Sequence, residues 1–282
     1  MSETNSKLYI VATPIGNLSD LSFRAVEVLK SVDLIAAEDT RHAKVLLQHY
    51  GIDTRLISVH EHNEVRVAPQ LISQIQQGLA IALISDAGTP LLSDPGLPLV
   101  KLARESGVEV SPIPGPSAVI AAISASGLPV HKFTFEGFSP RHAAARKSWF
   151  EQKSSDATTW VFYESSHRVL ASITDLATVL PADHRICIAR ELTKLHETIV
   201  TASVQELLVL LQDDKNMLKG EFVVIVAGAK QQETDDEVEE LQRILKILLQ
   251  ECSLKTAVAL AGEITGARKR QLYQMALDLN QL

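Results

Sequence analysis

The sequence predicts an α/β protein with two α/β blocks and a small helical domain at its C-terminal end. Short apolar runs alternate with segments of helical periodicity from residue 8 to residue 227, and glycines and prolines separate them. Three prolines at 112–116 interrupt this alternation, and only helical periodicity remains after residue 229. We therefore expect three domains, at residues 1–117, 118–229 and 230–282.

The first block contains five short apolar runs that predict buried strands, at 8–12, 34–37, 55–59, 81–85 and 108–113. Between them lie amphipathic segments that predict helices, at 19–31, 40–51, 64–77 and 97–106. Ser19 or Asp20 and Thr40 are suitable N-caps, and glycines mark the ends of three of these helices. Such a strand–helix alternation favours a parallel sheet covered on both faces.

The second block predicts a small-residue helix at 117–126, for which Ser117 is a suitable N-cap. Five more strands are expected, at 132–135, 159–163, 185–189, 198–202 and 222–227. Further helices are expected at 143–153, 166–180 and 204–211. The block is therefore a second layer structure of helices on a sheet.

The C-terminal segment is helical in pattern and uneven in charge. Residues 231–252 carry a net charge of −5, whereas residues 253–282 carry +2. Two apolar stretches flank a turn at Gly266. This arrangement predicts a small domain similar to a helix-turn-helix.

Composition excludes several classes of protein. The 27 basic and 34 acidic residues give a net charge of −7, so nucleic acid must be bound by a local patch rather than by an overall basic field. Two cysteines without a CxxC motif argue against a disulfide framework and a structural zinc site. No apolar run is long enough to span a membrane, and residues 1–7 do not resemble a signal peptide, so we expect a cytoplasmic protein.

The motifs of several common enzyme classes are absent from the chain. It contains no GxGxxG, no P-loop, no GxSxG and no HExxH. His60, Glu61 and His62 have side chains that bind metals, but no third ligand can be assigned to them, so no metal site is predicted.

Three polar or proline-rich turns follow strands of the first block, at 12–18, 85–96 and 114–118. The carboxyl ends of parallel strands are where ligands bind in such sheets. Asp86 and Asp94 can accept hydrogen bonds from an amine or a ribose, and Gly88 lets a ligand approach the backbone. Each turn taken alone is also explained as a simple connection or a helix cap.

Ionisable residues cluster after two strands of the second block, at 163–168 and 190–197. A third stretch, at 138–150, mixes bases with aromatic residues that could bind phosphate and stack on RNA bases. Arg268, Lys269 and Arg270 could contact a phosphate backbone. Solvated ion pairs and an amphipathic helix explain the same patterns without a ligand.

Seven segments taken together resemble the tetrapyrrole methylase superfamily, and in particular its branch that modifies ribosomal RNA. In chain order they are LYIVATPIGNLSDLSFRAVEVLKSVDLIAAEDTRH, LISDAGTPLLSDPG, PIPGPSA, FEGF, FYESSHR, RELTKLHE and KGEFVVIVAG. They extend over residues 7–228, and the C-terminal segment resembles the small helical domain of that branch.

The resemblance implies a tetrapyrrole-methylase-like fold that holds S-adenosylmethionine, bent, in a cleft between the two αβα domains. It implies methyl transfer to the ribose 2′-hydroxyl of a decoding-centre cytidine in 16S ribosomal RNA of the small subunit. It also implies a homodimer in the cytoplasm, with no metal and no membrane. Two other functions stay open: methylation of a small tetrapyrrole-like molecule, and a ligand-sensing regulator that binds nucleic acid.

The resemblance also assigns residues to the cofactor: Pro14, Ala87, Gly88, Thr89, Ser117, Ala118, Tyr163, Glu164, Leu192, Thr193 and Glu221. The chain departs from the family at Thr89, because tetrapyrrole-binding relatives have Gly-Asp-Pro where this sequence has Gly-Thr-Pro. This departure weakens the hypothesis of a porphyrinoid substrate.

A ribose hydroxyl is a poor nucleophile, so transfer needs in-line placement and an acceptor for the proton. The candidate bases or orienting groups are Asp39, Asp86, Glu136 and Glu164. Candidate RNA contacts are the basic residues Arg41, Arg141, Arg146, Lys147, Lys194, Arg268, Lys269 and Arg270, with Lys255 beside the last three.

Overall fold

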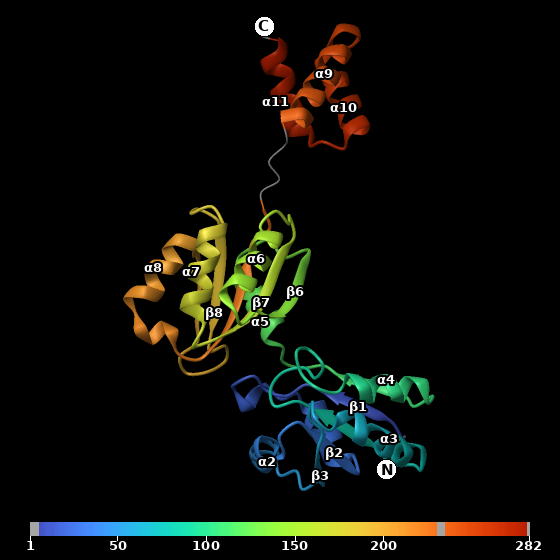
Figure 1. The fold of residues 1–282 in the computed structure, drawn as a ribbon. Coiled ribbons are helices and arrows are strands. Elements are labelled where there is room, and N and C mark those ends of the chain that lie inside the picture. The colour runs from blue at the N-terminus through green and yellow to red at the C-terminus, as the bar shows by residue number, and fades with distance from the viewer. Residues whose placement is uncertain (1–5, 230–234, 281–282) are drawn as a thin grey trace. The chain divides into compact units, whose positions relative to one another are not determined.

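The computed structural model describes residues 6–229 and 235–280, and the chain divides into two compact units, 1–229 and 230–282 (Figure 1). The larger unit contains two five-stranded sheets, each with its own helices. In residues 235–280, which are the described part of the smaller unit, the secondary structure is helical only. The fold class expected from the sequence is confirmed.

The first sheet is entirely parallel, with the strand order β3-β2-β4-β1-β5. Its strands are β1 (Leu8–Val11), β2 (Leu34–Ala37), β3 (Leu56–Ser58), β4 (Ile81–Ile84) and β5 (Val110–Ile113). Its helices are α1 (Phe23–Ser31), α2 (Thr40–His49), α3 (Glu64–Gln76) and α4 (Leu97–Glu105), with a short 3-10 helix at Leu18–Asp20. Because all five strands run the same way, the loops after them meet at one edge of the sheet.

Side chains alternate along the strands and so fill two separate cores. In β2, Ile35 and Ala37 face the core that contains α1 and α2, whereas Leu34 and Ala36 face the core that contains α3 and α4. This is the period-two pattern of a strand buried on both faces. It explains why β2 and β4 are apolar at every position.

The second sheet is mixed, with the order β6-β7-β10-β8-β9. Its strands are β6 (Phe133–Phe138), β7 (Thr159–Ser165), β8 (Arg185–Arg190), β9 (Thr198–Ser203) and β10 (Glu221–Val226). Only β6 and β7 pair in parallel, and the other three pairs are antiparallel. The sequence pattern predicts these strands but not the directions in which they pair.

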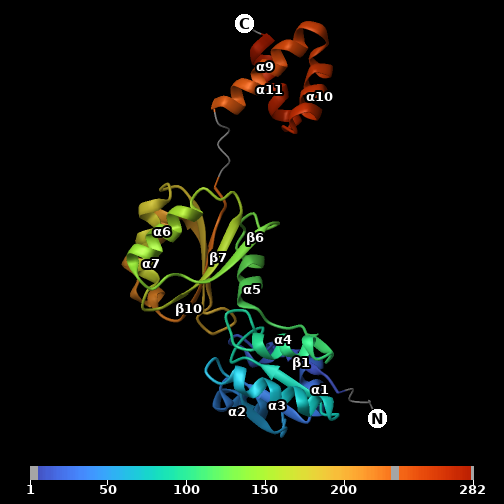
Figure 2. The same cartoon turned by 45° about the vertical axis from the view of Figure 1, so that its right-hand side comes forward.

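Helices cover both faces of the second sheet. A core of large side chains, including Phe150, Trp160 and Phe162, joins it to α6 (Ala143–Lys153), α7 (Val169–Val179) and α8 (Val204–Asp213), and a 3-10 helix at Lys215–Leu218 follows α8. On the opposite face α5 (Ala118–Ala125) packs through Val119, Ala122 and Ile123 (Figure 2). Since α5 belongs to this core, we keep residues 117 and 118 as the proposed domain boundary.

The smaller unit is a bundle of α9 (Asp235–Glu251), α10 (Leu254–Thr265) and α11 (Lys269–Asn280). Its core contains Leu245, Val258 and Leu272, each from a different helix. Ser253 caps α10, and Gly266 ends it with a positive φ of 71°, as the turn in the sequence predicts.

Three helix starts differ from the sequence analysis. Ser22, not Ser19 or Asp20, caps α1, because its hydroxyl accepts a hydrogen bond from the amide of Ala25. Asp39, not Thr40, caps α2. The helix expected from 166 begins instead at Val169, because residues 166–168 form a turn. Among the described residues, no helix is both long and apolar enough to cross a membrane.

Candidate functional site

A cavity of about 500 Å³ lies where the loops of the first sheet face the second sheet. We call it the interdomain cavity. Its walls come from the loops after β1, β2, β4 and β8, the N-terminal end of α5, the ends of β6 and β7 and the start of β10. The lining residues are Ile15, Glu38, Asp86, Ala87, Gly88, Thr89, Leu92, Asp94, Ser117, Ala118, Phe138, Tyr163, Glu164, Ser165, Ser166, Ala189, Leu192, Gly220, Glu221, Phe222 and Val223.

Three loops of the first domain are joined by hydrogen bonds at the cavity. The Thr13 amide donates to the Gly88 carbonyl at 2.8 Å, and the Gly88 amide donates back to Thr13 at 3.0 Å. Gly88 has a φ of +81°, a conformation that other residues rarely adopt. The Thr89 hydroxyl donates to the Pro116 carbonyl at 3.1 Å. Thr89 therefore links the loop after β4 to the loop before α5.

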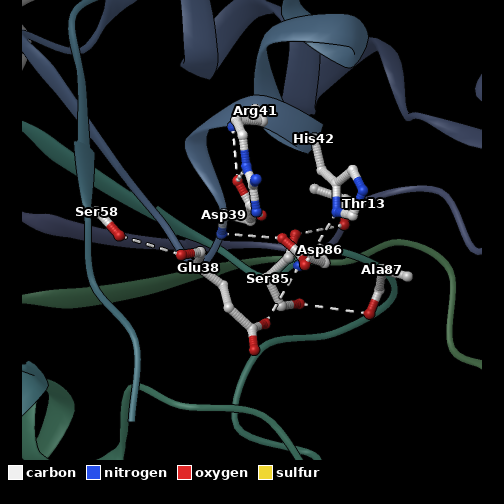
Figure 3. A network of polar contacts seen from close by, with 9 residues as sticks. All are labelled: Thr13, Glu38, Asp39, Arg41, His42, Ser58, Ser85, Asp86 and Ala87. Atoms are coloured by element: carbon white, nitrogen blue, oxygen red, sulfur yellow. Dashed lines mark hydrogen bonds and ion pairs between the residues drawn. The ribbon is translucent and has the colours of Figure 1, made fainter. Parts of the chain in front are cut away.

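Carboxylates at the edge of the first sheet differ sharply in their partners (Figure 3). One oxygen of Asp86 accepts the Asp39 amide at 3.0 Å, and the other lies 3.2 Å from Nδ1 of His42. Asp39 caps α2 and pairs with Arg41 at 2.6 Å. Hydrogen bonds from Arg41 hold the pKa of Asp39 well below its usual range. Burial and the negative charge of Asp86 raise the pKa of Glu38.

On the second domain's wall, Glu164 is fully buried and every oxygen is engaged. It pairs with Arg168 at 2.6 Å, accepts the Ser165 amide at 2.9 Å and accepts the Ser139 hydroxyl. Tyr163 lies beside it in the cavity wall. Burial, helped by the charge of Asp94, raises the pKa of Tyr163 to about 12, so its phenol stays protonated.

The two α/β domains also meet at a close contact between the loop after β1 and the loop after β8. The Asn17 amide donates to the Thr193 hydroxyl at 3.1 Å. A Cβ added to Gly16 would lie 2.5 Å from Cγ of Lys194 and 3.0 Å from the Leu192 carbonyl oxygen, so the backbones approach too closely for a side chain. We call this contact the clasp. Lys194 is fixed there by ion pairs with Glu191 and Glu221, each at 2.9 Å.

Substitution of Gly16 by valine tests whether the cavity depends on the clasp. The added methyl groups have no free space beside Lys194 and Leu192, and such overpacking typically costs about 1–3 kcal/mol. We expect a lower Tm in thermal unfolding and weaker binding of S-adenosylmethionine, the cofactor that the sequence resemblance implies, measured by calorimetry. Binding that stays at the wild-type level would show that the cavity does not need these loops to meet.

A basic groove of about 550 Å³ lies on the helical unit, between α10 and α11. Its lining residues are Lys255, Val258, Ala259, Lys269, Arg270, Tyr273 and Gln274. Tyr273 is 49% exposed, so its ring is available for contact. In the described part of the chain, no group of three or more His, Cys, Asp or Glu residues is arranged to hold a metal ion.

Comparison with known proteins assigns the larger unit to a family. The model described as Tetrapyrrole (Corrin/Porphyrin) Methylases matches residues 7–208. The chain belongs to the tetrapyrrole methylase family. A second model, the RsmI C-terminal HTH domain, matches residues 235–280, which contain α9, α10 and α11. The resemblance seen in the sequence is thus confirmed for both parts.

Curated relatives of this tetrapyrrole methylase match it along almost its whole length. Ribosomal RNA small subunit methyltransferase I from Escherichia coli O157:H7 is 50% identical over 275 residues, covering 98% of this chain and 96% of the relative. The protein of the same name from Pseudomonas aeruginosa is 50% identical over 272 residues, covering 96% of both chains.

Solved structures of two methyltransferases share the fold at low identity. Cobalt precorrin-4 methyltransferase CbiF has a TM-score of 0.58 at 14% identity and covers 80% of this chain and 97% of its own. The uroporphyrin-III-C-methyltransferase of Thermus thermophilus has a TM-score of 0.53 at 19% identity and covers 79% of this chain and 94% of its own.

The cavity of this tetrapyrrole methylase brings together most of the residues expected at the cofactor. Those that line it are Ala87, Gly88, Thr89, Ser117, Ala118, Tyr163, Glu164, Leu192 and Glu221, with the candidate base Asp86. Pro14 is buried next to the lining residue Ile15, and Thr193 lies in the clasp. Sequence reasoning missed Glu38, although its position directly after β2 places it at the same sheet edge.

Three candidate bases of this tetrapyrrole methylase are engaged in other contacts. Glu136 does not line the cavity and pairs with Lys153 at 2.6 Å. Asp39 also does not line it and serves as a helix cap. Glu164 lines it, but its oxygens are occupied.

The expected RNA contacts are spread over different environments. Arg146 is buried and donates from Nε to Asp175 at 2.9 Å, so it has no surface to offer a phosphate. Lys194 is held in the clasp. The exposed residues of the set are Arg41, Arg141, Arg268, Lys269 and Arg270, and Lys147 is 44% exposed.

Proposed function

We propose that this protein is an S-adenosylmethionine-dependent methyltransferase that methylates the ribose 2′-hydroxyl of a decoding-centre cytidine in 16S ribosomal RNA of the small subunit. The observation that carries the proposal is that one chain matches two family models, the methylase model over the unit that contains the cavity and the C-terminal domain model over the helical unit. The relatives that are about 50% identical along the chain bear a ribosomal RNA methyltransferase name.

The cavity residues suit S-adenosylmethionine in size and chemistry. A volume of about 500 Å³ is within the range of pockets that hold ligands of this size. Ile15, Leu192 and Val223 offer apolar surface, and the Gly88 backbone permits close approach. Glu38 and Asp86 supply negative charge that favours a cationic ligand. When bound, the cofactor supplies a methyl group already activated on a sulfonium.

The protein's own contribution to the reaction is placement. With both ligands bound, closure of the cavity by the two domains would hold the acceptor hydroxyl close to the methyl group, and such placement removes much of the entropic barrier. The clasp and the Thr89–Pro116 hydrogen bond hold the loops of the two walls in position before any ligand binds. No metal takes part in this proposal.

The basic groove supplies the local patch that a chain with a net charge of −7 needs for RNA. Lys255, Lys269 and Arg270 can neutralise phosphates, and the exposed ring of Tyr273 offers a stacking surface for an unpaired base. Arg141 and Lys147 add exposed positive charge on the larger unit. We also propose that the protein is a homodimer in the cytoplasm. Light scattering would measure the number of subunits.

The deciding experiment combines the purified protein, methyl-labelled S-adenosylmethionine and small subunits from cells that lack this gene. We expect label in a single ribose-methylated cytidine, located by nuclease digestion and mass spectrometry. Parallel reactions contain a porphyrinoid substrate or duplex DNA in place of subunits. Label in the porphyrinoid would support small-molecule methylation, and tight duplex binding without transfer would support the regulator; either result would refute the proposal.

Charge reversal in the groove tests the RNA contact. Lys269→Glu should weaken binding to small subunits about tenfold, because Lys269 lines the groove. The slope of log affinity against log salt concentration should also fall by about one, the value expected for the loss of one phosphate contact. Lys246→Glu is the matched control, since Lys246 is an exposed lysine of the same unit outside the groove. Filter binding at several salt concentrations measures both. Equal losses in the two variants would assign the effect to net charge alone.

A further inference from the structure

Asp94 is a carboxylate of the cavity wall that is held there by a strained loop. It lies in the segment between β4 and α4. Leu91 and Ser93 adopt positive φ angles of 74° and 69°, which non-glycine residues rarely do. The Gly96 amide donates to a Glu64 oxygen at 2.6 Å and fixes the far end of the loop. Strain of this kind persists only where the surrounding structure dictates the conformation, and it is concentrated at functional sites.

The surroundings of Asp94 leave its carboxylate available. The groups that face it are Glu38 at the end of β2, Asp86 after β4 and Tyr163 across the cavity on β7. Burial raises the pKa of Asp94 to about 6, the Ser85 hydroxyl opposes the rise, and the charges of Glu38 and Asp86 add to it. Among residues 6–229 and 235–280, no cation forms an ion pair with it.

The other carboxylates of the cavity lining have polar partners: Glu221 pairs with Lys194 at 2.9 Å, and Glu38 accepts the Asp86 amide at 3.5 Å. Asp86 has one oxygen on the Asp39 amide and the other beside His42. Glu164 has both oxygens occupied by Arg168, Ser165 and Ser139. A general base works best with a pKa near the working pH and a free lone pair.

We propose that Asp94 accepts the proton of the ribose 2′-hydroxyl during methyl transfer, an assignment that rests on the proposed function. The hydroxyl oxygen forms a bond to the methyl carbon while the carbon–sulfur bond breaks and its electron pair stays on sulfur. The proton passes from that oxygen to the Asp94 carboxylate. The products are the 2′-O-methylated cytidine and S-adenosylhomocysteine, and the protonated Asp94 then releases its proton to water.

The kinetic test compares wild type with Asp94→Asn in single-turnover methylation of small subunits between pH 5 and pH 9. We expect the wild-type rate to fall below about pH 6, where Asp94 is protonated. We expect the Asp94→Asn rate to be about a hundredfold or more below that of wild type and to show no such fall at low pH. Its affinity for S-adenosylmethionine, measured by calorimetry, should stay within about twofold of wild type. Asp94→Glu should recover part of the rate, and Asp53→Asn, at an exposed loop position, is the control.

The stability of the same variant gives a readout independent of activity. A carboxyl whose pKa is raised on folding costs stability above that pKa, and the cost shrinks as the pH falls below it, until the carboxyl of the unfolded chain is also protonated. Asp94→Asn should therefore have a Tm a few degrees above wild type at pH 8, and the difference should shrink at pH 5.

Four results would overturn the assignment: an unchanged rate in Asp94→Asn, a retained fall in its rate at low pH, a loss of cofactor affinity equal to the loss of rate, or a Tm difference independent of pH. A wild-type protein that methylates no cytidine would overturn the proposed function and this assignment together. An active wild type with an unaffected variant would overturn the assignment of Asp94 alone.

Discussion

Replacement of Gly88 by valine is expected to reduce S-adenosylmethionine affinity at least tenfold and to lower stability by about 1–2 kcal/mol. The stability loss follows from the φ of +81°, which places Cβ too close to the following carbonyl. The affinity loss follows from the position of Gly88 in the cavity wall, where a Cβ would already lie 3.4 Å from Ile15. The branched side chain would then occupy space that the ligand needs. Calorimetry measures affinity, and thermal unfolding measures stability.

The matched control for this prediction is Gly107→Val. Gly107 has a φ of +71°, so it carries a similar backbone strain, and a Cβ there would meet nothing within 4 Å. It lies at the exposed end of α4, away from the cavity lining. We expect the control to lose stability but to bind the cofactor normally. If both variants bound it equally well, the cavity would not be the cofactor site.

Replacement of Arg146 by methionine is expected to destabilise the protein by roughly 3–5 kcal/mol, because it leaves Asp175 without its main partner in a buried position. For a unit of this size the Tm should fall by more than about 6 °C. Lys147 lies 3.5 Å from the same carboxylate and is 44% exposed, so it compensates only in part. Thermal and denaturant unfolding measure the loss.

A double variant separates the two roles that Arg146 could have. Arg146→Met combined with Asp175→Leu removes both charges and should recover much of the lost stability, since an apolar pair can replace a buried ion pair. Binding to small subunits should then resemble that of wild type. A stable double variant with weakened subunit binding would return Arg146 to the set of RNA contacts.

Local patterns in the sequence were sufficient to locate the elements of the first sheet and the turns at its edge. The apolar run at 34–37 becomes β2, buried on both sides, and the glycines after three helices end them as expected. The strand–helix alternation correctly predicted a parallel sheet, because only a crossover connection joins parallel strands. The seven family segments are also local stretches of chain, so the family could be recognised from the order of residues alone.

Tertiary structure decided which of the candidate side chains are available for chemistry. Arg146 and Lys147 are neighbours in the sequence, yet one is buried against Asp175 and the other is partly exposed. Asp86 and Asp94 share one loop, yet Asp39 and His42 engage only the first. The partners of Arg146 and Asp86 lie in elements many residues away along the chain. Strands β7 and β10, which pair antiparallel in the second sheet, are likewise brought together from distant parts of the sequence. Local periodicity depends only on neighbours along the chain, whereas burial and charge pairing depend on contacts that exist only after the chain has folded.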